Sequence, residues 1–307
     1  MVPMPYFLAV DAGGTKTDFA LADDHQILAR ARAGSIKRMR VDAATANFHL
    51  EAALAELAAL SGISLQQVTC TCVGTAGETV PLVVEWIREA FGSRVGGELV
   101  IRGDVEIALD AGFRGGEGIL VLAGTGSNVI ARGADGKLQG AGGYGPVLAD
   151  QGSGHRIGEQ VLRRIFLAKD ERVTTLLSEA VLQFWQLGSL NELIAFVHAD
   201  PRPDLSKLAP IVLQCAEAGD VLALEVLEHE GEELGYLVRL LLRRAWSDGA
   251  PLPSLAFAGS VMEHYGPVRQ ALLKAVRAEF AGVGELPGVV DPVQGALWRA
   301  RLAAVLA

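Results

Sequence analysis

The sequence has few cysteines, no long apolar run and no excess of positive charge. Its three cysteines, Cys70, Cys72 and Cys215, are too few for a disulfide framework, and none belongs to a CxxC pair, which favours a reducing compartment such as the cytoplasm. No stretch of 18 uncharged apolar residues is present, which argues against a membrane span. Asp and Glu outnumber Lys and Arg by 36 to 27, for a net charge of −9, so we expect no nucleic-acid partner.

What the sequence has in excess is glycine. It holds 36 glycines in 307 residues, roughly 12% where about 7% is typical. They gather around 13–14, 112–145, 152–158 and 259. Glycines clustered at strand ends indicate tight turns or backbone that approaches a ligand. Half of the residues are hydrophobic, so the chain is globular, and its length predicts about two domains.

Two stretches of the chain share one pattern of short strands. Each predicts three strands in an antiparallel meander, joined first by a Gly-Thr turn and then by an Asp turn. The strands are expected at 6–10, 18–22 and 26–32, and again at 118–122, 129–132 and 137–140. Gly13 lies eleven positions before Asp24, and Gly124 lies eleven positions before Asp135. We interpret this as a diverged internal duplication, with a chance likeness of two meanders as the alternative.

Around the meanders, hydrophobic periodicity predicts further strands and many helices. Strands are expected at 68–73, 98–102 and 254–258, and helices at 43–60, 80–91, 105–111, 155–168, 172–186, 190–198, 206–218, 221–246, 264–279 and 293–306. In the first helix we expect Asp42 as the N-cap and Phe48, Leu50, Leu54 and Leu57 on the buried side. The pattern indicates an α/β protein with two similar lobes and a small-molecule site in the cleft between them.

The first Gly-Thr turn lies in the segment 11–17, DAGGTKT, at the end of a predicted strand. Its backbone amides can wrap a phosphate, and Lys16 can pair with that phosphate as a point charge. Asp11 is placed to hold the water shell of Mg²⁺. The plain alternative is an ordinary hairpin turn. A Walker A loop is excluded, because GxxxxGK[ST] is absent and a strand, not a helix, follows.

The second turn, Gly124–Asn128, has the sequence GTGSN. It resembles the start of a dinucleotide-binding GxGxxG loop, but Val129 replaces the last glycine and a strand follows where a helix is required. We therefore reject a Rossmann site. Two such turns, at equivalent places in two lobes, can clamp a polyphosphate from both sides.

Three further places are candidates for chemistry. Asp104 follows a strand and begins a helix, where its carboxylate can be a general base or a simple N-cap. The glycine-rich segment 140–158 carries Val147 and Leu148 in its middle, which favours an ordered loop lining a site over an interlobe linker. Gly259-Ser260 ends a strand and either lets a flat ring approach the backbone or forms an ordinary turn.

These motifs together resemble the N-acetylglucosamine kinase family of the actin-like ATPase and hexokinase superfamily. The same grouping includes the ATPase activators of 2-hydroxyacyl-CoA dehydratases and benzoyl-CoA reductase. The resemblance spans essentially the whole chain, at 11–17, 103–104 (GD), 122–128 (LAGTGSN), 142–145 (GGYG), 150–154 (DQGSG) and 258–260 (AGS). It implies a duplicated, ribonuclease H-like fold. Its N-terminal lobe would span 1–115 plus the C-terminal helix at 293–307, and its C-terminal lobe 116–292, with helical insertions.

The resemblance implies transfer of a phosphoryl group from ATP to an amino sugar, most simply to O6 of N-acetylglucosamine, by a homodimer. It implies that Asp104 is the catalytic base and contacts the sugar, and that Asp11 holds Mg²⁺ through water. The residues implied for ATP and its phosphates are Gly13, Gly14, Thr15, Lys16, Thr17, Gly124, Thr125, Gly126, Ser127, Ala216, Gly259 and Ser260. Those implied for the sugar are Asn128, Gly143, Tyr144, Gly145 and Asp150.

Departures from the family pattern lie on the sugar side. The loop 34–39, GSIKRM, lacks the Asn that the family usually places there. A Trp, an acid and an aromatic pair of the family are also replaced, at Tyr144, Gln151 and His155-Arg156. His155 is either a ligand contact or a cap or surface group. The basic residues Lys37, Arg38 and Arg40 indicate either an acidic sugar such as N-acetylmuramate or a solvated loop, and glucosamine also stays open.

Two other functions remain open from the sequence. An ATPase activator of a dehydratase or reductase would share an iron–sulfur cluster across a dimer, which needs cysteines near the second turn. No cysteine lies between residues 73 and 214, which argues against this function. A sugar sensor without catalysis would not need Asp104 or two complete phosphate turns, so their presence favours a kinase.

Overall fold

The computed structural model describes residues 4–246 and 251–306. The chain forms two compact units: unit 1 comprises Met1–Gly116 with Val290–Ala307, and unit 2 comprises Glu117–Val289. The parts of our lobe prediction at residues 1–3, 247–250 and 307 lie outside the described residues. Within the described ranges, every helix is too short or too polar to serve as a transmembrane segment.

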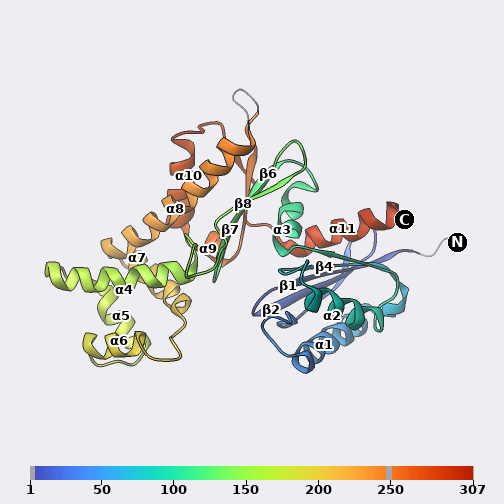
Figure 1. Ribbon diagram of the computed structural model, residues 1–307, viewed down its shortest axis with the longest axis horizontal. Helices are drawn as coiled ribbons and strands as arrows, with labels where there is room; N and C mark the ends of the chain where they lie inside the picture. Colours follow the sequence, from blue (N-terminus) through green and yellow to red (C-terminus); the bar gives the residue numbers. More distant parts are fainter. Residues whose placement is uncertain (1–3, 247–250, 307) are drawn as a thin grey trace. The chain divides into compact units, whose positions relative to one another are not determined.

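Unit 1 is built on one five-stranded sheet (Figure 1). Its strands are β1 (Tyr6–Ala12), β2 (Lys16–Ala22), β3 (Ile27–Gly34), β4 (Val68–Thr75) and β5 (Glu98–Arg102). The order across the sheet is β3-β2-β1-β4-β5, with an antiparallel β1-β2-β3 meander and with β4 and β5 parallel to β1. Because β1 and β5 run the same way, their carboxyl ends, with Asp11 and Asp104, lie at the same edge of the sheet.

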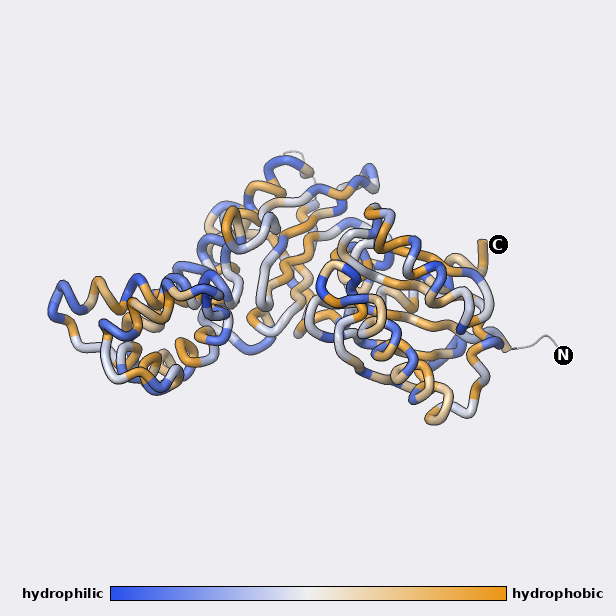
Figure 2. Tube along the Cα trace, turned by 60° about the horizontal axis from the view of Figure 1, so that its bottom comes forward, coloured by the Kyte–Doolittle hydropathy of each residue, from blue (hydrophilic) through white to orange (hydrophobic). Residues whose placement is uncertain are grey.

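Helices cover both faces of this sheet. They are α1 (Ala43–Ser61), α2 (Pro81–Gly92), α3 (Asp104–Phe113) and α11 (Pro292–Leu306), with a short 3₁₀ turn, η1 (Leu65–Gln67). Along β1, Leu8 and Val10 point into the core under α1 and α2, and Phe7 and Ala9 point into the core under α3 and α11. Both faces of β1 are therefore apolar, and Figure 2 shows orange, hydrophobic segments inside this unit.

Helix α1 confirms one expectation and corrects another. Asp42 is its N-cap, and the Asp42 carboxylate accepts a hydrogen bond of 2.8 Å from Thr45 N. Phe48, which we expected on the buried side, is 70% exposed. Leu50, Leu54 and Leu57, expected on the same side, are buried as predicted. At about 100° per residue, Phe48 lies roughly on the side opposite to Leu50, two positions away.

The C-terminal helix α11 packs against α3 and against β1 and β4 of unit 1 (Figure 1). Gly295 makes the closest part of this contact, because a Cβ atom there would overlap with the backbone carbonyl of Ile107. Such close contact of two helix backbones requires a residue without a side chain.

We expect Gly295→Ala to lower the free energy of unfolding by about 1–3 kcal/mol, since overpacking forces the two helices apart. Gly92→Ala is the matched control, because a Cβ atom there meets nothing within 4 Å. Urea denaturation followed by tryptophan fluorescence measures both variants. An unchanged transition midpoint in Gly295→Ala would contradict this packing.

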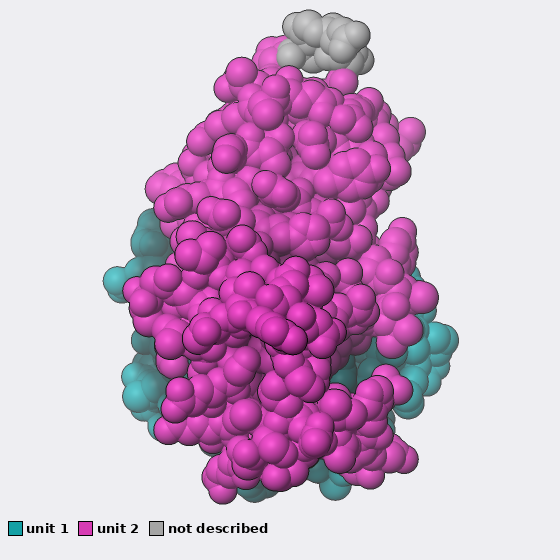
Figure 3. Space-filling model, turned by 90° about the vertical axis from the view of Figure 1, so that its left-hand side faces the viewer, with its two compact units in different colours: residues 1–116, 290–307 teal, residues 117–289 magenta. Residues whose placement is uncertain are grey.

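Unit 2, magenta in Figure 3, contains a second five-stranded sheet. Its strands are β6 (Gly118–Ala123), β7 (Ser127–Arg132), β8 (Leu138–Ala141), β9 (Ser254–Ala258) and β10 (Gly284–Glu285). Their order is β10-β9-β6-β7-β8, with an antiparallel β6-β7-β8 meander and with β9 and β10 parallel to β6. Read from β8, this is the order of unit 1, so the shared fold confirms the predicted duplication.

Unit 2 carries most of the helices that the structure describes. They are α4 (Gly154–Glu171), α5 (Leu176–Phe184), α6 (Leu190–Val197), α7 (Ala209–Glu217), α8 (Val221–Ala245), α9 (Ser260–His264) and α10 (Gly266–Arg277), with a 3₁₀ turn, η2 (Leu205–Leu208). Helix α8 contacts α4, α7 and α10 as well as strands of the sheet. These elements share one hydrophobic core.

The structure adds two short elements to the prediction for unit 2. The helix predicted at 264–279 is α10, and the short helix α9 before it was not predicted apart from its last residue. The two helices are separate because Gly266 and Pro267 begin a new helix after Tyr265. Strand β10 was not predicted at all. It has only two residues, paired with Ser254 and Leu255 of β9, so its pattern is too short to recognise.

Candidate active site

The first Gly-Thr turn joins β1 to β2, and the segment after β3 holds it in place. Ser35 Oγ donates a hydrogen bond of 2.8 Å to the carbonyl of Gly13. Thr17 is buried, and its hydroxyl accepts a hydrogen bond of 3.2 Å from Ile36 N. Gly14, Thr15 and Lys16 are exposed, as a phosphate-binding turn requires. Thr17 thus supports the turn and does not present its hydroxyl on the surface.

The carboxyl group of Asp11 is largely buried, and negative charge surrounds it. Burial, together with the nearby charges of Asp104, Asp18 and Asp291, raises its pKa to about 7, although Lys16 acts in the opposite direction. A divalent cation would offset this negative charge. Carboxylate oxygens are also the ligand type that Mg²⁺ prefers. The residues present therefore fit the predicted magnesium site.

Asp104 is the first residue of α3, beside Asp11 in unit 1. The N-cap is Gly103, so the interpretation of Asp104 as an N-cap is wrong. Its Oδ1 accepts a hydrogen bond of 2.9 Å from Val105 N, and its Oδ2 lies 3.7 Å from Lys37 Nζ. The side chains of Asp104 and Lys37 are 32% and 14% exposed. The carboxylate is thus oriented and still accessible.

The second Gly-Thr turn joins β6 to β7 and is held by backbone hydrogen bonds. Gly124 N donates to Gly126 O at 2.8 Å, which closes the turn. From the start of α4, Gly154 N donates to Gly124 O at 2.7 Å and His155 N donates to Thr125 O at 3.2 Å. The N-terminus of α4 therefore holds this turn in place, and His155 contributes to it with its backbone amide.

The glycine-rich segment before α4 is an ordered loop, as expected, and not a linker. Asp150 Oδ1 accepts a hydrogen bond of 2.8 Å from Ser127 N, and Ser127 Oγ donates to Gln151 O at 2.7 Å. Asp150 is only 6% exposed. At least one oxygen of this predicted sugar ligand is thus occupied in supporting the turn.

Other residues predicted for the sugar lie together in unit 2. A Cβ atom on Gly143 would come 2.7 Å from the side chain of Asn128, so the two are in close contact. Tyr144 is 70% exposed, and Val147 and Leu148 further along the loop are 93% and 79% exposed. Gly145 bonds back to the loop, since its carbonyl accepts hydrogen bonds from Leu148 N and Ala149 N.

Gly259 ends β9 beside the second turn. Its φ of +90° and the overlap that a Cβ atom would make with the carbonyl of Ala123 both require glycine. A Cβ atom on Gly124 would lie 3.8 Å from Ser260 Oγ, so Ser260 belongs to the same cluster. Ala216 lies on α7 against the core, and its assignment to the adenosine stays a prediction.

Sequence reasoning missed one charged residue beneath this cluster. Glu230, in the middle of α8, is fully buried, and its Oε2 accepts a hydrogen bond of 2.7 Å from Gly152 N. The available signal was a Glu on an otherwise apolar helix face, between Val226 or Leu227 and Leu234.

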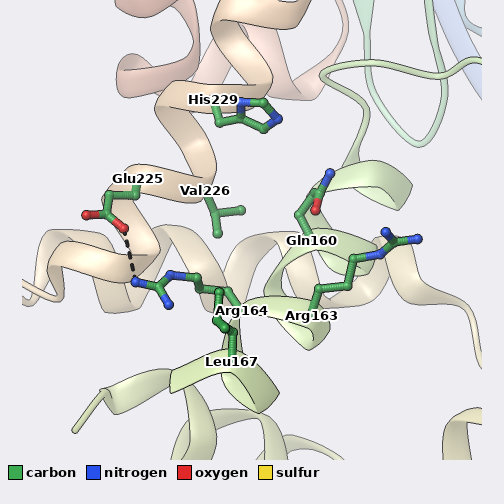
Figure 4. Close-up of a pocket in the computed structure, with 7 residues that line it drawn as sticks. All are labelled: Gln160, Arg163, Arg164, Leu167, Glu225, Val226 and His229. Carbon is green, nitrogen blue, oxygen red and sulfur yellow. Dashed lines mark hydrogen bonds and ion pairs between the residues drawn. The ribbon is translucent and has the colours of Figure 1, made fainter. Parts of the chain in front are cut away.

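A groove elsewhere in unit 2 contains none of the predicted site residues. It has a volume of about 230 Å³ and lies between α4 and α8 (Figure 4). Its lining consists of Gln160, Arg163, Arg164, Leu167, Glu225, Val226 and His229. Arg164 donates a hydrogen bond of 3.5 Å to Glu225 across it. We assign it no part in the site.

The paired meander sheets define an actin-like ATPase fold. The chain belongs to the BadF/BadG/BcrA/BcrD ATPase family, whose model matches residues 8–300.

Known relatives include amino-sugar kinases. An N-acetylmuramic acid/N-acetylglucosamine kinase of Clostridium acetobutylicum is 28% identical, with 78% of this chain and 80% of that protein covered. An N-acetyl-D-glucosamine kinase of Dictyostelium discoideum is 27% identical, with 94% and 96% covered. Among solved structures, a candidate N-acetylglucosamine kinase from Chromobacterium violaceum matches with a TM-score of 0.72 at 26% identity, with 96% and 98% covered. The chain is thus related to amino-sugar kinases.

Proposed function

We propose that this protein is an ATP-dependent kinase that phosphorylates an amino sugar, with O6 of N-acetylglucosamine as the foremost acceptor. The observation that carries the proposal is the environment of Asp104. Its carboxylate stands at the start of α3, is accessible, and lies beside Asp11 and Lys37. This is the arrangement of a base next to a metal-binding carboxylate.

In the proposed reaction, a sugar hydroxyl gives its proton to a carboxylate oxygen of Asp104 as the hydroxyl oxygen attacks the γ-phosphorus of ATP. The bond from that phosphorus to the β,γ-bridging oxygen breaks, and ADP leaves. Asp11 would hold Mg²⁺ through water, and the bound ion would neutralise phosphate charge. Lys37 holds the Asp104 side chain in place from the loop after β3.

The two Gly-Thr turns are the proposed phosphate sites. In unit 1 the amides of the exposed residues 14–16 and the Lys16 ammonium would contact phosphate. In unit 2 the turn at 124–127 would do the same, with Gly259 and Ser260 toward the adenosine. Supporting this, hydrogen bonds hold each turn before any ligand binds, which lowers the entropy cost of binding.

The identity of the sugar is a finer part of the proposal. Asn128, Gly143–Gly145 and Asp150 would contact its hydroxyls from unit 2. The partly buried ammonium of Lys37 also favours an acceptor that carries a carboxylate, such as N-acetylmuramate, because the ammonium would pair with that additional charge. The relatives also differ in the acceptor sugar: one is named for N-acetylmuramic acid and N-acetylglucosamine, and the other for N-acetyl-D-glucosamine alone.

The cysteines bear on the alternative of an ATPase activator. Cys70 and Cys72 lie in the core under α11, and burial raises the pKa of Cys70 to about 11 and that of Cys72 to about 12. Thiols of that kind stay protonated and are poor cluster ligands. We therefore favour the kinase, and we include a homodimer in the proposal as the family resemblance implies.

The proposal is tested by ADP release with Mg-ATP and each of several acceptors: N-acetylglucosamine, glucosamine, N-acetylmuramate, N-acetylmannosamine, glucose and no sugar. We expect turnover that requires a hexosamine. If Lys37 binds a carboxylate, Lys37→Met lowers kcat/KM for N-acetylmuramate about 10-fold or more relative to N-acetylglucosamine. Lys137→Met, an exposed lysine paired with Asp135, is the control. ADP release that ignores every sugar would overturn the kinase assignment.

A further inference from the structure

Glu230 is a buried carboxyl group that the proposed chemistry does not use. It is 0% exposed, on the face of α8 that also buries Leu227 and Leu234. Burial raises its pKa, while the Gly152 amide and Arg156 lower it. Burying such a group is costly unless it is hydrogen-bonded or paired, so its contacts decide what it does.

The two oxygens of Glu230 face the loop that leads into α4 and the first turn of that helix. Oε2 accepts a hydrogen bond of 2.7 Å from Gly152 N. Oε1 lies 3.6 Å from Arg156 Nε and, in the described chain, has no hydrogen-bond partner. The amide contact is therefore the short, directional one, and the contact with Arg156 is a looser ion pair.

The residues on either side of Gly152 support the second Gly-Thr turn. Asp150 Oδ1 accepts from Ser127 N, and Gln151 O accepts from Ser127 Oγ. On the other side, Gly154 N donates to Gly124 O. The turn is thus held by residues 150–154, and Gly152, in the middle of that segment, is attached to Glu230.

Gly152 also limits how this segment can sit on α8. Its φ is +72°, and a Cβ atom there would overlap with Leu234, one helical turn beyond Glu230. Glu230 and Leu234 are thus the two α8 side chains that contact the 150–154 segment at Gly152. If the hydrogen bond to Glu230 were lost, the amide would be buried without an acceptor, and the segment would have to shift to find one.

We propose that Glu230 is a positioning residue for nucleotide binding: by accepting the Gly152 amide, it fixes the 150–154 segment and, through it, the turn at 124–127. This inference depends on one part of the proposed function, namely that the turn at 124–127 binds phosphate. The geometry of the hydrogen bond is the essential part, and the negative charge is secondary.

Three variants separate these contributions. Glu230→Gln keeps a side-chain oxygen at the same reach, so we expect nucleotide affinity within about 5-fold of wild type. Glu230→Asp keeps the charge but is one methylene shorter, and Glu230→Ala removes the acceptor. For these two we expect affinity lower by about 10- to 100-fold, the cost of losing a hydrogen bond to a charged group. Glu228→Ala, exposed on the same helix, is the control.

The measurement is calorimetric binding of a non-hydrolysable ATP analogue with Mg²⁺, with hydrogen exchange at the amides of Gly152 and Ser127. In active protein, KM for ATP should rise in Glu230→Asp by a larger factor than kcat falls. KM for the sugar should rise as well, because Asp150, a proposed sugar contact, lies in the same segment. Glu230→Asp that binds like wild type, or Glu230→Gln that binds as weakly as Glu230→Ala, would overturn the inference. If Glu230→Ala does not fold, the Asp and Gln variants still decide it.

Failure of the kinase assignment gives a different result. Sugar-dependent turnover would then be absent from wild type, but the nucleotide analogue would bind, and its affinity would still order the variants as stated. No binding of the analogue to wild type would reject the phosphate role of the turn, and with it the inference.

Discussion

Replacing Asp104 by Asn is expected to lower kcat for sugar-dependent ADP formation by about 10²- to 10⁴-fold. The amide has the shape of the carboxylate and can still accept the hydrogen bond from Val105 N. It cannot take a proton from the acceptor hydroxyl. The loss should therefore appear mainly in kcat, with KM for ATP within a few-fold of wild type, because Asp104 is not a proposed ATP contact.

The control is Asp24→Asn, an exposed carboxyl group in the turn between β2 and β3 of the same unit. It should leave kcat unchanged. Circular dichroism and melting of both variants show whether the fold is intact. If Asp104→Asn keeps a tenth or more of the wild-type kcat, Asp104 is not the base, and the hydroxyl must be deprotonated elsewhere.

The parts of the fold that were predicted correctly are those with a repeated local signal. The two meanders share an eleven-residue spacing between Gly-Thr and Asp turns, and both form the expected antiparallel strands. Strand β10 has two residues and no period to detect. Phe48 shows a different limit, because a helix pattern with apolar residues on several sides does not say which side is buried.

In the candidate site, too, features that depend on neighbouring residues were predicted, whereas contacts between residues far apart in the sequence were not. Asp11 and Asp104 were singled out from the sequence because each stands at the end of a predicted strand, and the family resemblance implied their roles. The partners of a side chain were harder to predict. Asp150 was assigned to the sugar, yet it accepts the amide of Ser127, 23 residues away. Glu230 contacts Gly152 from 78 residues away, and only the folded chain shows that contact.

Asp11→Asn is expected to stabilise the protein in the absence of nucleotide and metal, and more so at higher pH. The folded chain holds the pKa of Asp11 at about 7, above its ordinary value of 3.8. The carboxyl group therefore contributes full stability below pH 3.8 and loses it as the pH rises through 7. Each pKa unit corresponds to about 1.36 kcal/mol, so Asn should gain about 2 kcal/mol at pH 5.5 and about 4 kcal/mol at pH 8.5.

Urea denaturation at the two pH values measures this gain, with Asp24→Asn as the exposed control. Metal then separates function from stability. Mg²⁺ with an ATP analogue should stabilise wild type more than Asp11→Asn, because only the carboxylate gains a counter-charge. If Asp11→Asn is less stable than wild type at pH 8.5, ionisation of Asp11 does not destabilise the folded protein, and the prediction is wrong. The expected result would mean that the Asp11 carboxylate lowers the stability of unit 1 at the place where the proposed metal binds. Asp11→Asn would then be more stable than wild type but inactive.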